Sequence, residues 1–134
     1  MNEEQVQLEL SVAAQAENIP LVRHAVAGFL EGHDVGGDQA SDILLAVTEA
    51  CTNVVQHAYR DGAAERAEIE IWAELHGSTV TITVRDQGGG FAPRVDSPGL
   101  GLGLPVIAAL TQTVEIRPTP PSGTEVVMTF SLEP

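Results

Sequence analysis

Three short segments place strong limits on how this chain of 134 residues can fold. The first is the pair Glu49 and Asn53, and the second is the run Asp86-Gln-Gly-Gly-Gly90. The third, Gly99-Leu-Gly-Leu-Gly103, has glycine at every second position. Glycine permits positive φ and lets a ligand approach the backbone closely. This ordered set predicts one binding site assembled from distant parts of a single domain.

The periodicity of apolar residues predicts the elements that carry these segments. Strands are expected at residues 6–12, 67–76, 80–86, 114–117 and 126–132, the last two as a hairpin. Helices are expected at 18–31 with Asn18 as the N-cap, from Asp38 or Ser41 to Tyr59, and at 100–110. We therefore predict one α+β domain over residues 1–134, a two-layer α/β sandwich with three helices covering a mixed or antiparallel sheet.

The charge balance excludes several functions. The net charge is -13, and all six basic residues are arginine. Nucleic acid is not expected as a direct partner, because phosphate contacts require clustered positive charge. Without lysine, a Walker-type phosphate loop, a Schiff-base enzyme and a lysine-dependent protein-kinase fold are excluded. A bound triphosphate would have to be held by a metal, backbone amides, a helix end or an arginine.

The sequence also predicts a protein that does not enter a membrane. No apolar run is long enough to cross a bilayer, and the acidic start lacks a signal-peptide pattern. Cys51 is the only cysteine, so no internal disulfide can form, which fits a reducing compartment. We expect a cytoplasmic protein.

The expected second helix has one apolar and one polar face. Glu49 and Asn53 lie one turn apart on the polar face, so both can address one ligand, and His57 continues that face. A carboxylate can take a proton from an attacking hydroxyl, and an amide oxygen is a suitable Mg²⁺ ligand. A solvated helix face gives the same pattern. Cys51 falls on the opposite, apolar face and is expected to be buried.

The two glycine clusters suit a nucleotide. Asp86 ends a strand, where its carboxylate can accept a hydrogen bond from an adenine amino group, although a strand-ending turn looks similar. The second cluster opens a helix, where free backbone amides and the helix dipole attract anions. Thr124, at the start of the last strand, has a hydroxyl that can assist purine recognition.

Taken together, these residues resemble the Bergerat-fold ATPases, the superfamily of gyrase, heat-shock chaperones, histidine kinases and mismatch-repair ATPases. The N-box of that superfamily is matched from Glu49 to Asn53 and continues through His57-Ala58-Tyr59. Its two glycine boxes are matched by Asp86, Gly88 and Gly90, and then by Gly99, Gly101 and Gly103. Within the superfamily the chain looks like the anti-sigma-factor serine/threonine kinases.

The resemblance implies a role for each matched position. Glu49 would be the general base and Asn53 the Mg²⁺ ligand, with His57 beside the nucleotide. Asp86 would bind the adenine amino group with help from Thr124. Residues 91–98 would form a lid over ATP, in which Arg94 reaches the terminal phosphate. The glycines would shape the pocket (Gly88 and Gly90) and approach the phosphates (Gly99, Gly101 and Gly103).

The function implied by the resemblance is an ATP-dependent serine/threonine protein kinase that acts as an anti-sigma factor. It would phosphorylate an anti-sigma-factor antagonist and sequester a sigma factor, and a homodimer is left open because relatives are often dimers. Two related readings also stay open: a nucleotide-gated binding module without phosphotransfer, and a freestanding histidine-kinase-type ATPase domain. A plain α+β interaction domain is the reading without a nucleotide.

Overall fold

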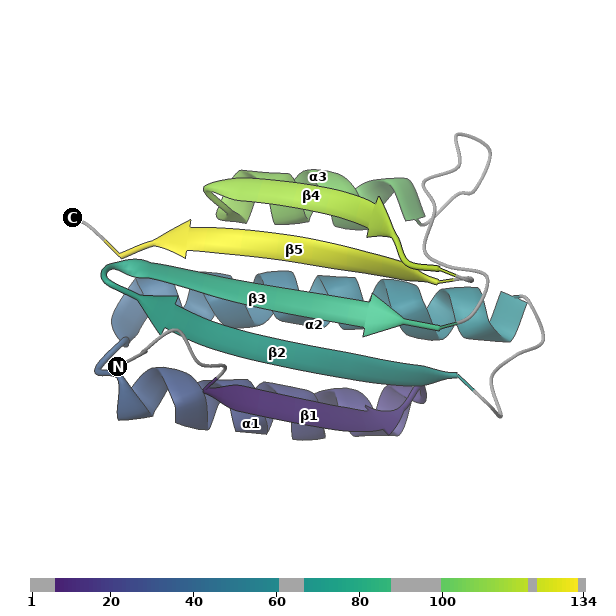
Figure 1. Cartoon of the computed structure of the whole chain (residues 1–134), viewed down its shortest axis with the longest axis horizontal. Helices are drawn as coiled ribbons and strands as arrows, with labels where there is room; N and C mark the ends of the chain where they lie inside the picture. The colour runs from purple at the N-terminus through teal and green to yellow at the C-terminus, as the bar shows by residue number, and fades with distance from the viewer. Residues whose placement is uncertain (1–6, 61–66, 88–99, 121–122, 133–134) are drawn as a thin grey trace.

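The computed structural model describes residues 7–60, 67–87, 100–120 and 123–132, without the side chains of 57–60 and 100–103 (Figure 1). Its strands pair into one sheet, and its α-helices lie on one face of that sheet. The strands are β1 (Leu8–Ala13), β2 (Glu68–His76), β3 (Thr79–Asp86), β4 (Thr113–Pro118) and β5 (Thr124–Ser131). The helices are α1 (Ile19–Gly32), α2 (Gly37–Arg60) and α3 (Leu100–Leu110), with a short 3-10 turn at Ala16–Asn18. The predicted α+β sandwich is confirmed.

The strands follow the order β1-β2-β3-β5-β4, and every neighbouring pair is antiparallel. The sheet is therefore antiparallel rather than mixed. β2 and β3 form a hairpin whose turn contains Gly77 at φ +58, a left-handed conformation that glycine adopts without strain. The predicted hairpin of β4 and β5 is also present, and it inserts β5 beside β3.

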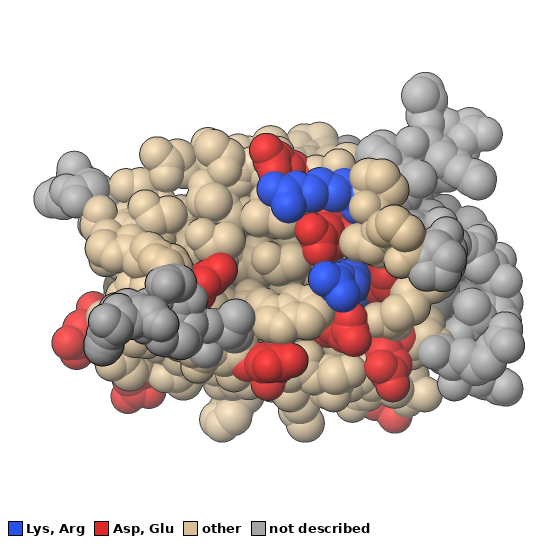
Figure 2. All heavy atoms as spheres, viewed as in Figure 1, with Lys and Arg blue, Asp and Glu red and all other residues tan. Residues whose placement is uncertain are grey.

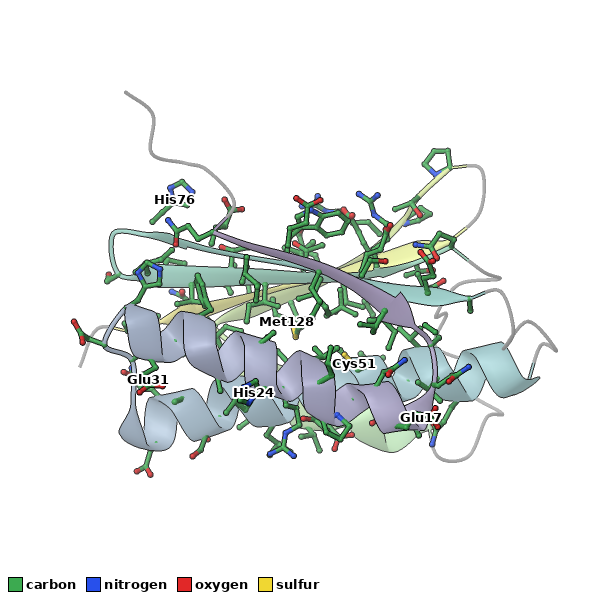
Figure 3. All side chains as sticks on the ribbon, turned by 90° about the horizontal axis from the view of Figure 1, so that it is seen from below. Glu17, His24, Glu31, Cys51, His76 and Met128 are labelled. Carbon is green, nitrogen blue, oxygen red and sulfur yellow. The ribbon has the colours of Figure 1, made fainter. Side chains whose placement is uncertain are left out.

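The core lies between the sheet and the helices. β3 buries every second residue from Val80 to Asp86, and β5 does the same from Thr124 to Phe130. Side chains on alternate residues of a strand point to opposite faces, so these rows face the helices. Cys51 of α2 and Met128 of β5 both point into this layer (Figure 3), and both are fully buried. The apolar face predicted for the second helix is confirmed.

Two helix starts differ from the sequence prediction. Asn18 precedes α1, but its side chain makes no cap hydrogen bond. Its Nδ2 instead donates to the carbonyl oxygen of Ala13 at 2.9 Å, which ties the turn to the end of β1. Helix α2 begins at Gly37, ahead of Asp38 and Ser41. Gly37 has φ +64, a left-handed conformation that glycine adopts without strain at the point where the chain enters the helix.

Helix α2 runs the length of the sheet and contacts both α1 and α3 as well as β3 (Figure 1). Its second half lies behind the end of β3 and the start of β5. The start of α3 lies at the same end of the molecule, so the described parts of the segments singled out in the sequence meet there. In the described part of the chain, no helix is long and apolar enough to cross a membrane.

Candidate nucleotide-binding site

Buried polar side chains mark one end of the sandwich. Within the described residues, three polar or charged side chains are buried: Asn53, Asp86 and Thr124, with 2%, 5% and 8% of their surface exposed. All three belong to the predicted site. Burying a polar group costs free energy unless it is hydrogen-bonded, so the gathering of three buried polar side chains makes this end of the domain the candidate ligand site.

Asp86 and Thr124 are brought together by strand pairing. Asp86 is the last residue of β3 and Thr124 the first of β5, and the register places them directly opposite each other. Each continues the inward-facing row of its strand, so the carboxylate and the hydroxyl both face the helix layer. The sequence predicted that both would contact the purine, and the fold makes them neighbours.

Gly123 is a residue of the site that the sequence motifs did not include. Its φ is +128, which strains any residue with a Cβ atom. A Cβ there would collide with the carbonyl oxygen of Asp86 and come within 2.8 Å of the Thr119 Oγ1 and 3.2 Å of the Gln87 Cα. The backbone of the last strand can therefore approach Asp86 only because residue 123 is glycine. The signal in the sequence was a glycine directly before Thr124.

Glu49 and Asn53 lie one turn apart on α2, as predicted. Glu49 is half-buried, while Asn53 is enclosed, so this face of the helix is not simply solvated. The Asn53 Nδ2 has no hydrogen-bond partner among the described residues. A buried amide with an unused polar atom requires an explanation, and a ligand at this position would supply one.

The chemistry of the donor set tests the fit of Mg²⁺: the unpartnered Nδ2 of Asn53 is an N–H donor, so only the amide oxygen Oδ1 could be the ligand. An amide oxygen is a ligand that Mg²⁺ accepts, usually with one carboxylate, several waters and substrate phosphates. Asn53 offers such a buried amide, and Glu49 offers a carboxylate one turn earlier. No group of three or more His, Cys, Asp or Glu side chains that could hold a metal occurs among the described residues. The donor set suits an ion shared with the phosphates of a nucleotide, not an all-protein metal cage.

The remaining predicted residues divide into two groups. Gly101 and Gly103 lie in the first turn of α3, which packs against α2, and backbone N–H groups in a first turn lack partners inside the helix. His57 lies in α2, but its side chain is not described. Gly88, Gly90, Arg94 and Gly99 fall outside the described residues, so their roles stay predictions.

A groove of about 250 Å³ lies at the opposite end of the same layer. It is formed where α2 begins and where α3 and β5 end. None of the predicted site residues lines it. Its lining residues are Gln39, Asp42, Ile43, Leu110, Thr111, Gln112, Phe130, Ser131 and Leu132. We therefore assign the nucleotide site from the buried polar residues and not from this groove.

Comparison with known proteins shows the family of the chain. The family described as the histidine kinase-like ATPase domain matches residues 12–130. The serine-protein kinase RsbW of Bacillus pumilus is 29% identical over 144 residues, covering 96% of this chain and 88% of the relative. An anti-sigma F factor of a Thermoanaerobacter species is 31% identical over 133 residues, with 91% of each chain covered. The chain therefore belongs to the histidine kinase-like ATPase family and, within it, to the anti-sigma-factor kinases.

Solved structures support the fold. The RsbU and RsbW domains of a Mycobacterium tuberculosis protein match with a TM-score of 0.72 at 23% identity, over 92% of this chain and 31% of that longer chain. The SiaB-SiaC complex of Pseudomonas aeruginosa matches with a TM-score of 0.70 at 14% identity, over 95% of this chain and 90% of that one. The architecture predicted from the motifs is the architecture of these proteins.

Proposed function

We propose that this chain is an ATP-dependent serine/threonine protein kinase that acts as an anti-sigma factor. It phosphorylates an anti-sigma-factor antagonist and, in the alternate state, sequesters a sigma factor. The observation that carries the proposal is the coincidence of two sets: the buried polar side chains Asn53, Asp86 and Thr124 are all residues of the family motifs. The names of the relatives, serine-protein kinase and anti-sigma F factor, support the same activity.

Adenine recognition rests on the pair formed by Asp86 and Thr124. A carboxylate accepts hydrogen bonds and cannot donate them when ionised. It therefore suits the amino group that adenine carries, and it repels the carbonyl oxygen that guanine and hypoxanthine carry at the same ring position. The hydroxyl of Thr124, directly across the ladder, can donate to a ring nitrogen of the purine. The pair thus favours ATP over the triphosphates of guanine and hypoxanthine.

Phosphoryl transfer rests on the face of α2. The Asn53 amide oxygen would hold Mg²⁺ together with the phosphates, and the ion supplies charge neutralisation on the transferring group. Glu49, one turn earlier, accepts the proton of the acceptor hydroxyl as that oxygen bonds to the γ-phosphorus. The bond from the γ-phosphorus to the bridging oxygen breaks at the same time, and ADP leaves.

The start of α3 supplies positive potential in a chain that has no lysine. Gly101 and Gly103 lie in the first turn of this helix, where unpaired N–H groups and the helix dipole stabilise phosphate oxygens. Arg94 in the proposed lid is the candidate cation for the terminal phosphate. These contacts replace the lysine on which many kinases depend.

The strong acidity of the chain bears on its partners. A net charge of -13 repels nucleic acid and favours encounters with basic protein surfaces. We therefore infer that the chain regulates transcription by binding another protein and not by binding DNA. We place it in the cytoplasm, where ATP, sigma factors and their antagonists occur together.

Purified protein tests the proposal. With Mg²⁺ and ATP labelled on the γ-phosphate, the wild type is expected to label one member of a panel of antagonist domains. Glu49→Gln is expected to lower the rate of labelling about a hundredfold or more, because a general base contributes about that much, while the Kd for ATP stays within about threefold. Asp42→Asn, on the same face of α2, is the matched control and is expected to keep the rate.

Two outcomes would count against the kinase activity. If no antagonist is labelled and Glu49→Gln behaves like the wild type, transfer is absent. Tight ATP binding in that case would favour the nucleotide-gated binding module instead. If neither ATP nor ADP binds in a calorimeter, the nucleotide site itself is wrong.

A further inference from the structure

Five charged side chains form a ladder across the outer face of the sheet, the face that carries none of the described helices. Glu70 of β2, Arg85 of β3, Glu125 of β5 and Arg117 of β4 lie directly opposite one another in successive strand pairs. Glu115 of β4 completes the set. Figure 2 shows this face, with two basic side chains interleaved among acidic ones toward one end of the sheet. We call these five residues the charge ladder.

Arg85 is the central residue of the charge ladder. Its Nη1 lies 3.8 Å from Glu70 Oε1, and its Nη2 lies 3.4 Å from Glu125 Oε1. The guanidinium carbon also lies 4.7 Å from the centre of the Trp72 ring, a cation–π arrangement. The Nε is buried and has no hydrogen-bond partner among the described residues. The two carboxylates and the indole thus hold the side chain on three sides.

Glu125 links Arg85 to the edge of the sheet. It is the least exposed member, with 16% of its side chain accessible. Its second carboxylate oxygen lies 3.5 Å from Arg117 Nη1, and Arg117 is in turn bound to Glu115 at 2.6 and 3.1 Å. The ladder therefore connects β2, β3, β5 and β4 through side chains, in addition to the backbone hydrogen bonds.

The charge ladder lies immediately beside the adenine site. The strand pair that holds Arg85 and Glu125 is followed, one residue on, by the pair that holds Asp86 and Thr124. Successive residues of a strand point to opposite faces, so the charges lie outside and the site residues inside. β3 ends at Asp86 and β5 begins at Thr124, and strand ends are where a sheet opens most readily.

We propose that Arg85 and Glu125 are positioning residues for adenine recognition, acting through Asp86 and Thr124. The Arg85–Glu125 ion pair holds the end of β3 and the start of β5 together on the outer face. It thereby fixes the separation between the Asp86 carboxylate and the Thr124 hydroxyl, which bind the purine. The proposal rests on the proposed function, because it assigns a role within the same nucleotide site. It adds two residues that lie outside the family motifs and do not touch the ligand.

A purely structural ladder makes a different prediction. Surface ion pairs contribute little to stability, and losing one would weaken the binding of all nucleotides equally if it only loosened the fold. A ladder that positions Asp86 acts on discrimination between bases. ATP and inosine triphosphate (ITP) differ where the carboxylate binds, since ITP carries a carbonyl oxygen in place of the amino group. The ratio of their Kd values separates the two roles.

The test measures Kd for ATP and for ITP by calorimetry on the full chain. Arg85→Met keeps the apolar stem over Trp72 and removes the charge. It is expected to lower the ITP-to-ATP Kd ratio at least about threefold, and Arg85→Lys is expected to lower it less, since one cation remains but its forked geometry is lost. Glu125→Gln removes the negative charge that pairs with Arg85 at nearly constant side-chain shape, so it is also expected to lower the ratio, and it provides a second variant if Arg85→Met does not fold.

The matched control is Glu74→Gln. Glu74 lies on the same face of β2, is paired with His76 at 3.2 Å and stands opposite Thr81, about 17 Å along the strand from Asp86. It is expected to leave the ratio unchanged. If Arg85→Met and Glu125→Gln both keep the wild-type ratio, the positioning role is wrong while the nucleotide site stands. If the wild type binds ATP no more tightly than ITP, adenine recognition by Asp86 fails, and the positioning role fails with it.

Discussion

The two ends of the helix–sheet layer treat polar side chains in opposite ways. At the end where β3 stops and β5 starts, Asn53, Asp86 and Thr124 are buried. At the other end, the groove of about 250 Å³ is lined in part by polar residues, but none of these is fully buried. There Gln39 is exposed and its Nε2 donates to the Ser131 carbonyl oxygen at 3.3 Å. One end is open and polar at no cost, and the other encloses polar groups.

This difference is the reason for placing the proposed nucleotide site at the end with buried polar side chains. A polar group at the surface stays hydrated, whereas an enclosed one costs about 1–3 kcal/mol if it lacks a partner. An enclosed polar group that served no function would therefore be less favourable at this position than an apolar group of similar size. The hollow surface at the groove end requires no such explanation, because packing at the ends of three elements leaves room. We therefore infer the nucleotide site from the burial of polar atoms and not from the volume of a cavity.

The largest expected effect contrasts two turn glycines, one at each end. Gly123→Ala places a methyl group against the carbonyl oxygen of Asp86. It also forces an alanine to adopt the φ of +128 that residue 123 has in the structure. Overpacking and backbone strain together are expected to lower the free energy of unfolding by about 3 kcal/mol. The forced shift of Asp86 is expected to weaken ATP binding more than about tenfold. Urea unfolding and calorimetry measure the two effects.

Gly77→Ala is the control at the opposite end. Gly77 also has positive φ, at +58, but a Cβ there meets nothing within 4 Å. The left-handed conformation alone costs about 1 kcal/mol, and ATP binding is expected to stay unchanged. Equal losses of stability and equal losses of ATP affinity in the two variants would mean that the close approach at Gly123 has no part in the site.

The next effect contrasts two aspartates. Asp86→Asn keeps the shape of the buried side chain but removes its charge, and a hydrogen bond to a charged group is worth about 1.5–3 kcal/mol. ATP affinity is expected to fall about 10-fold to 100-fold. Asp42→Asn at the groove end removes an exposed charge and is expected to leave the Kd for ATP unchanged. Calorimetry with both variants would show an error in the assignment of the two ends if Asp42→Asn had the larger effect.

Local patterns predicted most of this end of the molecule. Alternating Val80, Ile82 and Val84 predicted the strand and its inward face, so Asp86 could be placed at its end. Helical spacing put Glu49 and Asn53 together. The family of the chain, predicted from these motifs, is confirmed by the match over residues 12–130.

What the sequence did not predict depends on pairing between strands far apart in the chain. The roles of Gly123 and Arg85 exist only because β5 inserts beside β3, in the register that sets Thr124 opposite Asp86. Periodicity reports the faces of one strand but carries no information about its neighbour. The prediction that Asn18 caps the first helix was wrong for a related reason, because its side chain donates a hydrogen bond to the carbonyl oxygen of Ala13 instead.

The third test concerns Cys51, a buried ionisable side chain that has no assigned role. Complete burial raises the pKa of the Cys51 thiol from 9.0 to about 12. The folded protein then holds the thiol proton more tightly than the unfolded chain does, so stability falls as the pH rises from about 9 toward 12. At pH 10 this loss is about 1.4 kcal/mol relative to neutral pH.

Cys51→Ala removes that titration. The difference in unfolding free energy between wild type and variant, measured in urea at pH 8 and at pH 10, is expected to shrink by about 1.4 kcal/mol. The chain has no lysine and a single tyrosine, and both proteins share the tyrosine, so its titration cancels. A difference that does not change between the two pH values would mean that the thiol is not enclosed in the core.

The smallest expected effect on the fold concerns Asn53, and it tests the comparison most directly. Its Nδ2 is enclosed without a partner among the described residues, so we expect the side chain to contribute little to the stability of the protein in the absence of nucleotide. In Asn53→Ala, loss of packing and relief of the unpaired amide act in opposite directions. Without nucleotide, the free energy of unfolding is expected to stay within about 1 kcal/mol of the wild type.

Mg²⁺ and ATP should then separate the two proteins. A ligand at a hundred times its Kd stabilises the folded state by about 2.7 kcal/mol, and the wild type is expected to gain this while Asn53→Ala gains much less. Val54→Ala, one residue along the helix and also buried, is the control: it is expected to lose stability without nucleotide and to keep the gain on adding it. If Asn53→Ala lost stability without nucleotide and kept the gain on adding Mg²⁺ and ATP, Asn53 would be a packing residue. The burial of polar side chains at this end would then not indicate a nucleotide site.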